Sequence, residues 1–350
     1  MKKYVINGRF FSQRMTGVQR FEREIVRELD SLCGEDEVII AVPKNADVDI
    51  DFNNIKVVRI GILKGVLWEQ ISFCIYLYLH GFTPINLGNV APVIRPGIVC
   101  VHDMIVIRNP EWFKAKYAMW SRFVYRFVFS KAERILTVSN FSRNEIKKCY
   151  PKYKGEINVV SEGWQHIVRN NKDGDTDPEY ILKKYGLIKN KYIFSNYQKV
   201  PYKNFQWIVE TAKNNEEMLF AITGWRNSKV HVDQKEELPS NVKMLGYISD
   251  IELKILIQNC YSFVFPSLSE GFGLPPIEAM ALGANVILSD IPVFREIFEN
   301  AALYIKADDY CIDLSKAIPS LVEEKNKVLS KYSWKAGAEE IYKVMQEIQE

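Results

Sequence analysis

The sequence has neither long hydrophobic runs nor paired cysteines. Its longest apolar run is ISFCIYLYL (71–79), far shorter than the roughly 20 residues that cross a bilayer as a helix. The six cysteines are scattered, with no CxxC pair and no Cys/His cluster at metal spacing, and we therefore expect reduced thiols and no metal centre. The N-terminus, MKKYVINGRFF, lacks the apolar stretch and cleavage site of a signal peptide, which predicts a cytoplasmic location.

The chain also has little net charge and no dinucleotide-binding glycine pattern. Lysine and arginine total 46 against 43 acidic residues, a net charge of +3, which argues against general binding to nucleic acid. No G-x-G-x-x-G follows any candidate strand, and this disfavours a dinucleotide oxidoreductase.

The 350 residues, 47% of them hydrophobic, show strand–helix alternation in two similar halves. Such alternation is typical of parallel sheets, and we predict an α/β protein with two doubly wound, Rossmann-like domains. The polar stretch HIVRNNKDGDTDPEY (166–180) has the composition of a linker. Apolar residues at helical spacing in the tail, Ala336, Ile341, Val344 and Ile348, predict a closing amphipathic helix. The predicted limits are 1–170, 171–335 and 336–350.

The richest candidate site is the stretch from Phe265 to Gly283. A candidate strand runs there into a loop with Gly271 and Gly273, then two prolines and a short helix. Backbone N–H groups at a helix start attract anions, and glycines let an anion approach closely. We therefore expect a phosphate at this loop.

Two carboxylates, Glu270 and Glu278, frame the loop. Beside a phosphate they are better suited to accept hydrogen bonds from hydroxyl groups, which points to sugar and ribose rings on either side of a diphosphate. The alternative is that Glu278 complements the helix dipole and Glu270 is a solvated loop residue.

The stretch SLSEGFGLPPIEAMALGANVILSD resembles the E-x7-E region of retaining nucleotide-sugar glycosyltransferases with two Rossmann-like domains, the GT-B fold. The resemblance extends over nearly the whole chain, through TGVQRF near the N-terminus, VHD (101–103), ILTVSNFSRNEI (135–146), PYKNF (201–205), ITGW (222–225), LGYISD (245–250) and the SW…A pattern (333–336). It implies two facing domains and a C-terminal helix that crosses back to the first.

The resemblance also implies site roles. Glu270 would bind the donor sugar and Glu278 the ribose; the backbone of Phe272, Gly273 and Leu274 would line the sugar and diphosphate. Lys203 would stabilise charge on the leaving diphosphate. Gly17 would bring backbone N–H groups to the diphosphate.

One departure from the family pattern concerns a second basic residue. The family usually carries an arginine near the end of the strand before PYKNF, where this chain has Ser195-Asn196-Tyr197-Gln198-Lys199. Lys199 would supply the charge, or Tyr197 a hydrogen bond, and an amine is not equivalent to a bidentate guanidinium.

His102 ends the candidate strand GIVCVHD. A neutral imidazole there could bind the donor sugar or organise the reacting centre; the alternative is a structural histidine. Ser139 follows another strand end, and we expect it to cap the next helix.

Aromatic and basic residues alternate from Trp112 to Lys131. This mixture suits a helix lying at a membrane interface, but a helix packed on a sheet also needs aromatic residues. Membrane contact and core packing both remain open.

Together these features and the resemblance predict a metal-independent glycosyltransferase without a cofactor, with a nucleoside diphosphate sugar as donor and a glycan or lipid-linked glycan as acceptor. The resemblance alone implies that the configuration of the sugar is retained. The resemblance places it in bacterial surface polysaccharide assembly (O-antigen, capsule or exopolysaccharide). The alternatives are a nucleotide-sugar epimerase or phosphorylase of the same fold, or an inactive nucleotide-sugar-binding subunit.

Overall fold

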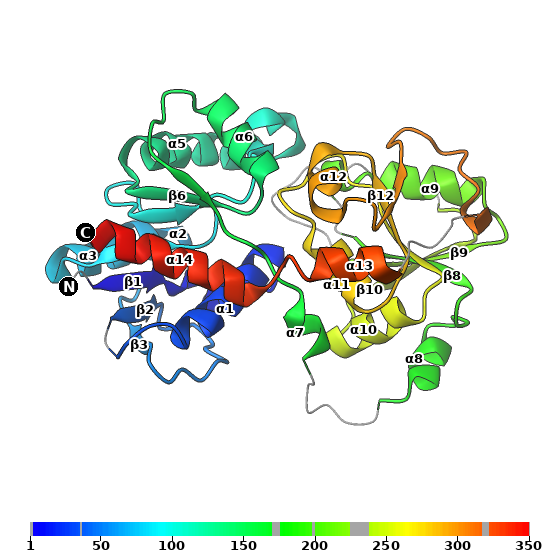
Figure 1. Cartoon of the computed structure of the whole chain (residues 1–350), viewed down its shortest axis with the longest axis horizontal. Coiled ribbons are helices and arrows are strands. Elements are labelled where there is room, and N and C mark those ends of the chain that lie inside the picture. Colours follow the sequence, from blue (N-terminus) through cyan, green and yellow to red (C-terminus); the bar gives the residue numbers. More distant parts are fainter. Residues whose placement is uncertain are drawn as a thin grey trace. The chain divides into compact units, whose positions relative to one another are not determined.

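The computed structural model describes residues 3–35, 37–169, 176–197, 200–224, 238–316 and 322–349. Contacts divide the chain into two compact units. The first holds residues 1–108, 115–163 and 333–350, and the second holds residues 109–114 and 164–332. Each unit is a sheet covered by helices (Figure 1).

The sheet of the first unit is parallel throughout its described residues. Its order is β3-β2-β1-β4-β5-β6-β7. The strands are β1 (Tyr4–Asn7), β2 (Val38–Val42), β3 (Lys56–Arg59), β4 (Thr83–Asn86), β5 (Ile98–Cys100), β6 (Arg134–Thr137) and β7 (Ile157–Val159). The chain runs outward from β1 to β3 and then returns to β4, so the strand order reverses between β1 and β4. Ligands of open parallel sheets bind beyond the carboxyl ends at such a point.

Helices connect these strands and cover both faces. They are α1 (Gly17–Asp30), α2 (Gly65–Leu67), α3 (Cys74–His80), α4 (Ile105–Arg108), α5 (Ala115–Lys131), α6 (Asn140–Cys149) and α14 (Trp334–Gln349). A short 3-10 helix, η1 (Gly8–Ser12), follows β1, and the π-helical segment η2 (Trp68–Phe73) joins α2 to α3. Because crossovers between parallel strands are right-handed, α1 covers one face and the α2–α3 segment, α5 and α6 cover the other.

The C-terminal helix α14 packs on α1 within the first unit (Figure 1). Trp334, Ile341 and Val344 are buried, and the Trp334 ring lies edge-on to Phe21 at 6.1 Å. The Tyr4 hydroxyl donates to the Met345 carbonyl at 2.5 Å. The predicted helix is therefore present, but its buried face runs through Trp334, Gly337 and Ala338, and Ala336 is exposed.

The sheet of the second unit is also parallel, with six strands among the described residues. Its order is β10-β9-β8-β11-β12-β13, and the strand order reverses between β8 and β11. The strands are β8 (Tyr192–Asn196), β9 (Leu219–Thr223), β10 (Val242–Gly246), β11 (Ser262–Phe265), β12 (Val286–Ser289) and β13 (Leu303–Ile305). The predicted α/β fold with two parallel-sheet units is confirmed.

The second unit has its own helices and core. The helices are η3 (Pro110–Trp112), α7 (Gln165–Val168), α8 (Pro178–Lys184), η4 (Pro201–Lys203), α9 (Phe205–Lys213), α10 (Asp250–Gln258), α11 (Leu274–Ala281), α12 (Pro292–Phe298), η5 (Leu314–Lys316) and α13 (Val322–Leu329). Trp207 of α9 lies at the centre of a core cluster with Ile222 and Val264. Residues 170–175 of the predicted linker lie outside the described residues, and His166 and Tyr180, at its ends, are helical.

The aromatic–basic segment 112–131 is not one helix. Trp112 and Phe113 belong to the second unit, where they pack on Tyr202 with ring centres 6.0 and 6.1 Å away. Helix α5 begins at Ala115, and within it Tyr125 is buried. Core packing thus accounts for part of the pattern.

Gly337 provides a test of the α14 packing. A Cβ atom at Gly337 would lie 2.3 Å from the Ser161 carbonyl oxygen and 3.0 Å from Ile25 Cδ1. Alanine normally stabilises a helix by about 0.5–1 kcal/mol over glycine, yet we expect Gly337→Ala to destabilise the first unit by about 1–2 kcal/mol because α14 must move away. Urea unfolding measures this, with Ala336→Gly as the exposed control on the same helix. A more stable Gly337→Ala protein would contradict the packing described.

Candidate functional site

The loop between β11 and α11 lies at the carboxyl end of its strand, next to the point where the strand order of the second unit reverses. Gly273 has φ = 115°, and a Cβ atom there would lie 2.9 Å from the Phe294 ring, so glycine is required. Phe272 and Leu274 on either side are buried, and Phe272 lies edge-on to Tyr332 at 5.2 Å. These buried side chains anchor the loop.

The start of α11 has few N–H groups of its own. Pro275 and Pro276 occupy its first turn and carry no N–H group, which suits positions that lack an intrahelical partner. The backbone donors at this helix start are therefore those of Phe272, Gly273 and Leu274. This is the stretch in which the sequence predicts contacts with a diphosphate.

Lys203 and Glu270 form an ion pair beside this loop. Lys203 Nζ donates to Glu270 Oε1 at 2.6 Å, and each side chain is 13% exposed. The ammonium also lies 4.4 Å from the centre of the Phe265 ring, and the Leu268 N–H donates to the Tyr202 carbonyl at 2.7 Å, which ties η4 to the loop. The charge of Lys203 is thus compensated by Glu270 in this structure.

Glu278, one turn into α11, is held by a histidine. His166 Nε2 lies 2.8 Å from Glu278 Oε1, and the two side chains are 4% and 10% exposed. The sequence analysis treated His166 only as the first residue of a linker. No motif signals it, because α7 brings it to α11 from more than 100 positions away in the chain.

The sequence names two candidates in this unit to replace the family arginine, Lys199 and Tyr197. Lys199 lies outside the described residues. Tyr197 is buried in the core cluster around Trp207, and its ring stacks on Phe205 with centres 4.7 Å apart. The Tyr197 ring is therefore a packing element.

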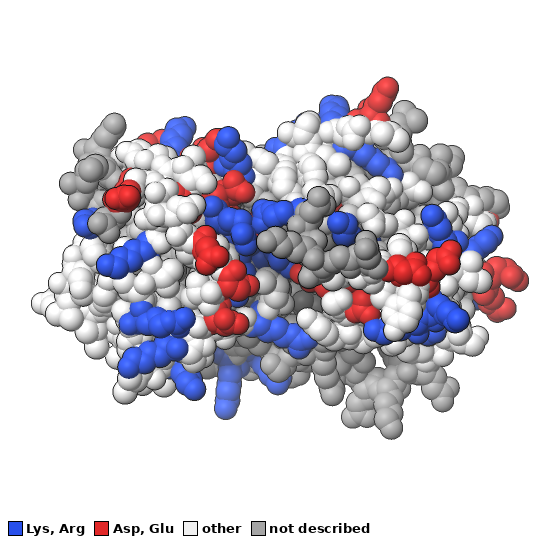
Figure 2. All heavy atoms as spheres, turned by 90° about the horizontal axis from the view of Figure 1, so that it is seen from below, with Lys and Arg blue, Asp and Glu red and all other residues white. Residues whose placement is uncertain are grey.

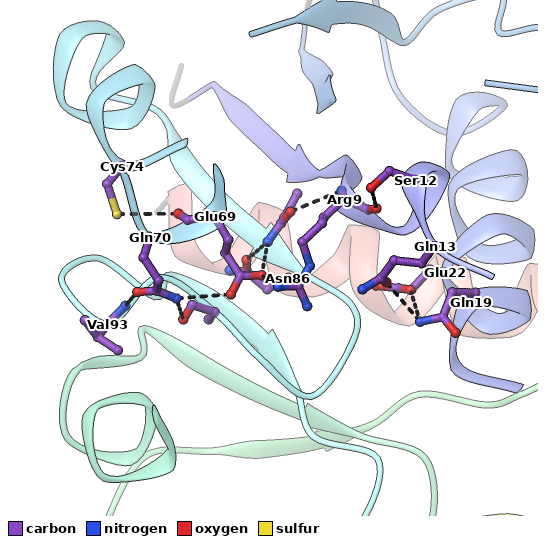
Figure 3. Close-up of polar contacts among 12 residues, drawn as sticks. Arg9, Ser12, Gln13, Gln19, Glu22, Glu69, Gln70, Cys74, Asn86 and Val93 are labelled. Carbon is purple, nitrogen blue, oxygen red and sulfur yellow. Dashed lines mark hydrogen bonds and ion pairs between the residues drawn. The ribbon is translucent and has the colours of Figure 1, made fainter. Parts of the chain in front are cut away.

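In the first unit, polar side chains gather where β1 and β4 end (Figure 3). The Asn7 side-chain amide donates to Glu69 Oε2 at 3.1 Å and to Asn86 Oδ1 at 2.9 Å. Arg9 pairs with Glu69 at 3.2 Å, the two side chains being 13% and 2% exposed. Buried charges need such partners, so Glu69 on the π-helical segment η2 is fixed from two sides.

Glu22 of α1 lies at the same strand ends and is buried. Burial, opposed in part by His102 and Arg9, raises the pKa of Glu22 to about 8. Gln19 Nε2 lies 3.5 Å from its carboxyl group, and a Cβ atom at Gly88 would lie 2.4 Å from it. Burial therefore favours the protonated form of Glu22.

His102 is buried just beyond β5. Its Nε2 lies 2.8 Å from the Leu87 carbonyl oxygen and its Nδ1 lies 3.7 Å from Glu162 Oε1. Burial alone would lower the pKa of His102, but Cys100 and Glu162 raise it well above its usual value. The sequence predicts a neutral imidazole, whereas the surroundings of His102 in the structure favour its charged form.

Gly17 and Ser139 lie at helix starts in the first unit. Gly17 is the exposed first residue of α1, directly after Thr16. Ser139 Oγ accepts from the Ser142 N–H at 3.0 Å, so its predicted role as a helix cap is confirmed. Gly17 and His102 thus belong to the first unit, and Lys203, Glu270 and Glu278 to the second.

The sequence analysis missed several buried polar residues of the first unit: Glu22, Glu69, Asn86 and Glu162. Asn86 carried a signal, because it ends the strand TPIN as Asn7 ends YVIN. Glu69 carried another signal, because it is the one acidic residue in the stretch 61–82. Glu22 could not be distinguished from the other acids of α1.

Comparisons with known proteins identify the family and the fold. The profile of the family described as "Glycosyl transferases group 1" matches residues 179–339. The O-antigen chain mannosyltransferase RfbU of Salmonella typhimurium is 31% identical over 253 residues, which cover 69% of this chain and 67% of that protein.

A second relative is a Campylobacter jejuni enzyme. It is an N,N'-diacetylbacillosaminyl-diphospho-undecaprenol alpha-1,3-N-acetylgalactosaminyltransferase, 28% identical over 213 residues, which cover 60% of this chain and 54% of that protein. Among solved structures, Anabaena HepE in complex with UDP and glucose superposes with a TM-score of 0.70 at 14% identity, covering 99% of this chain and all of that one. The structural likeness shows a shared fold.

The fold and the matched sequence define the class of protein, the two-domain GT-B glycosyltransferases. This chain belongs to the glycosyl transferases group 1 family and is a glycosyltransferase of the hexosyltransferase kind.

The raised pKa of Glu22 predicts a pH dependence of stability. Between the ordinary pKa of 4.5 and about 8, the folded chain holds a proton that the unfolded chain has lost. Stability therefore falls as pH rises, by up to about 1.4 kcal/mol per pH unit. Glu22→Gln stays neutral and lacks this dependence. Between pH 5 and 6.5 its free energy of unfolding should therefore rise relative to that of the native chain, by up to about 1.4 kcal/mol for each pH unit.

Urea unfolding at several pH values tests this, with Glu28→Gln, a partly exposed carboxylate of the same helix, as the matched control. A difference between Glu22→Gln and the native chain that does not change with pH would mean that Glu22 is ionised in the folded state.

Proposed function

We propose that this chain transfers a hexosyl group from a nucleoside diphosphate sugar to a hydroxyl of a glycan or lipid-linked glycan, in the assembly of O-antigen or a related surface polysaccharide. The name of the Salmonella relative supports O-antigen and a mannosyl group. The Campylobacter relative, whose name contains a diphospho-undecaprenol acceptor, supports a lipid-linked acceptor. The complex of HepE with UDP supports a nucleoside diphosphate in the donor.

The observation that carries the proposal is the grouping of Lys203, Glu270 and the 272–274 backbone beyond the carboxyl ends of the neighbouring strands β8 and β11. An ammonium beside a helix start suits a diphosphate. A carboxylate next to that ammonium suits the hydroxyls of the attached sugar. Glu278, fixed by His166 at 2.8 Å, is the second carboxylate and would accept from the ribose.

The Lys203–Glu270 pair implies an exchange of partners when the donor binds. The diphosphate would take the ammonium, and Glu270 would turn to the sugar hydroxyls. Because both side chains are largely buried, neither charge can be left without a partner except at high cost. A donor with both a diphosphate and a hydroxylated sugar satisfies both charges, whereas a free sugar satisfies only one.

In the proposed reaction the bond between the anomeric carbon and the phosphate oxygen breaks as the acceptor oxygen bonds to the same carbon and face. Because the new bond forms on the face that the phosphate leaves, the configuration is retained. The acceptor proton passes to the leaving phosphate. Lys203 would stabilise the charge that develops on that phosphate. We propose that this charge and the helix start replace a metal ion, so that EDTA leaves the rate unchanged.

The proposal is tested by screening nucleotide sugars, GDP-mannose and UDP-sugars included, for thermal stabilisation. A donor at 100 times its Kd stabilises by about 2.7 kcal/mol. Release of nucleoside diphosphate is then measured with and without a glycan acceptor. Release only with acceptor supports transfer; release or isomerisation without acceptor, or binding without turnover, contradicts it.

The pair of His166 and Glu278 predicts an effect on nucleotide affinity. A hydrogen bond from a ribose hydroxyl to a charged acceptor contributes about 1.5–3 kcal/mol, so Glu278→Ala should weaken nucleoside diphosphate binding about 10- to 100-fold. His166→Gln, which keeps a donor on Glu278, should weaken it less than His166→Ala.

Isothermal titration with the nucleoside diphosphate measures these affinities, and Glu296→Ala on α12 is a control for the loss of a carboxylate from the same unit. Unchanged affinity in Glu278→Ala would remove Glu278 from the ribose site.

The pair of Lys203 and Glu270 predicts that loss of either side chain lowers turnover, but that loss of the Glu270 charge does not weaken nucleotide binding. Lys203→Ala should lower kcat about 10²- to 10³-fold, as does the loss of one preorganised charge-stabilising donor. Glu270→Gln should also lower kcat, yet it should leave nucleoside diphosphate affinity equal or tighter because the ammonium no longer has a competing carboxylate.

Steady-state kinetics and nucleoside diphosphate titration separate the two effects, and Lys213→Ala on α9 is the control for loss of a lysine. If Glu270→Gln abolished nucleotide binding while kcat at saturation survived, the roles given to Glu270 and Glu278 would have to be exchanged.

A further inference from the structure

The helical segment from α2 to α3 in the first unit presents apolar side chains to solvent. Ile62, Leu67, Ile75, Tyr78 and Leu79 are between 55% and 87% exposed. From Leu67 onward they recur at helical spacing, while Trp68, Phe73 and Leu77 on the opposite side are buried against β1 and β2. One face of the segment thus packs on the sheet, and the other exposes a stripe of large apolar residues.

Helix α5 has a second such face. Met119 is 67% exposed and Phe123 47% exposed. Trp120 and Phe123 stack with ring centres 5.6 Å apart, and Phe127 lies edge-on to Phe123 at 4.9 Å. The core-facing side chains of α5, Val124 and Val128 among them, are buried, so this aromatic group is not needed to fill the core.

The two faces share a charge pattern. Residues 61–82 contain a single acidic residue, Glu69, which is buried, and residues 115–131 contain none. The exposed charges of these segments are cationic: Lys64, Lys116, Arg122, Arg126 and Lys131. By contrast, lysine and arginine are interspersed with aspartate and glutamate on the face of the molecule drawn in Figure 2.

Both apolar faces lie on the same side of the seven-stranded sheet. The crossovers that carry the α2–α3 segment and α5 run in the same direction across the sheet, from β3 to β4 and from β5 to β6. Right-handed crossovers in one direction place their helices on one face, and α1 with α14 covers the other. We name the exposed residues of the α2–α3 segment and α5 the outer layer.

A hollow lies at the C-terminal end of α5, at the edge of the outer layer. Its volume is about 630 Å³, and its walls include Phe129, Tyr150 and Tyr153. The Phe129 and Tyr150 rings stack 4.0 Å apart. The charged lining residues are Arg126, Lys152 and Lys154, and no acidic residue lines it.

We infer that the outer layer docks the first unit on an anionic bilayer, with a phospholipid phosphate group in the hollow. Protruding aliphatic and aromatic side chains insert at the headgroup boundary, and cations without neighbouring carboxylates attract anionic lipid. No helix in the described part of the chain is long and apolar enough to cross a bilayer. The inferred contact is made by the exposed faces of helices that pack on the sheet. The inference extends the lipid-linked acceptor of the proposed function.

Vesicle sedimentation of the full chain tests this inference. We expect binding to vesicles of phosphatidylglycerol and phosphatidylcholine that weakens in high salt, and at least tenfold weaker binding to phosphatidylcholine alone. The hollow variant, Arg126→Gln with Lys152→Gln and Lys154→Gln, should bind roughly 100-fold more weakly, because each cation near an anionic surface contributes about one factor of five to ten.

Two further variants separate charge from insertion. Lys3→Gln with Lys44→Gln and Lys56→Gln removes three exposed cations at strands β1 to β3 and should weaken binding about threefold or less. The apolar variant, Leu67→Ser with Ile75→Ser and Leu79→Ser, should weaken binding roughly tenfold. Because it keeps all the cations, the salt dependence of its binding should be unchanged. Circular dichroism melting checks that each variant folds.

Several outcomes would overturn the inference. One is that the native chain remains in the supernatant. Another is that vesicle binding weakens equally in the hollow variant and in the Lys3, Lys44 and Lys56 variant, which is its control. Self-association that disappears in the Leu67, Ile75 and Leu79 variant, without vesicle binding, would make the outer layer a protein interface. Turnover on a soluble acceptor, which the hollow variant should retain, separates this result from failure of the proposed function.

Discussion

The constraint on which this structure depends is that every described strand pair is parallel. Parallel strands need crossovers, and the crossovers bury both faces of the sheet. Polar side chains therefore have room mainly beyond the strand ends. Asn7, Asn86 and His102 lie there in the first unit, and the 266–274 loop lies there in the second. The same constraint leaves the outer sides of the covering helices as the surface on which other partners can act.

Within each unit, buried charges have partners. Lys203 pairs with Glu270 at 2.6 Å in the second unit and Arg9 with Glu69 at 3.2 Å in the first, while the buried carboxylate of Glu278 has His166 at 2.8 Å. Each pair is largely buried, and removal of one partner leaves a charge that is costly to bury. Under the proposed function, a ligand of the second unit would replace a partner rather than fill an empty position. A ligand with both anionic and hydroxyl groups, such as the proposed nucleotide sugar, suits this exchange.

Glycines at two places show how packing and chemistry are joined. At Gly273 a side chain would strike Phe294, and at Gly337 it would strike the Ser161 carbonyl. The first close approach fixes the loop that presents its backbone, and the second seats α14 on the first unit. In both cases the absence of a Cβ atom is required by a neighbour distant in sequence. The prolines of α11 act differently, because they fix the helix start through their own ring geometry.

The sequence by itself determined the α/β class, the helix at the C-terminus, the Ser139 cap and the strand–loop–helix unit around Gly273, because these follow from local periodicity and backbone geometry. It also pointed to Lys203, Glu270 and Glu278 through a motif. Only the tertiary structure decided that His166 holds Glu278, that burial raises the pKa of Glu22, that Tyr197 is a core residue, and that Trp112 packs on Tyr202. These depend on burial and on partners distant in the chain, and the pKa and exposure of a side chain are set by such partners rather than by its neighbours in sequence.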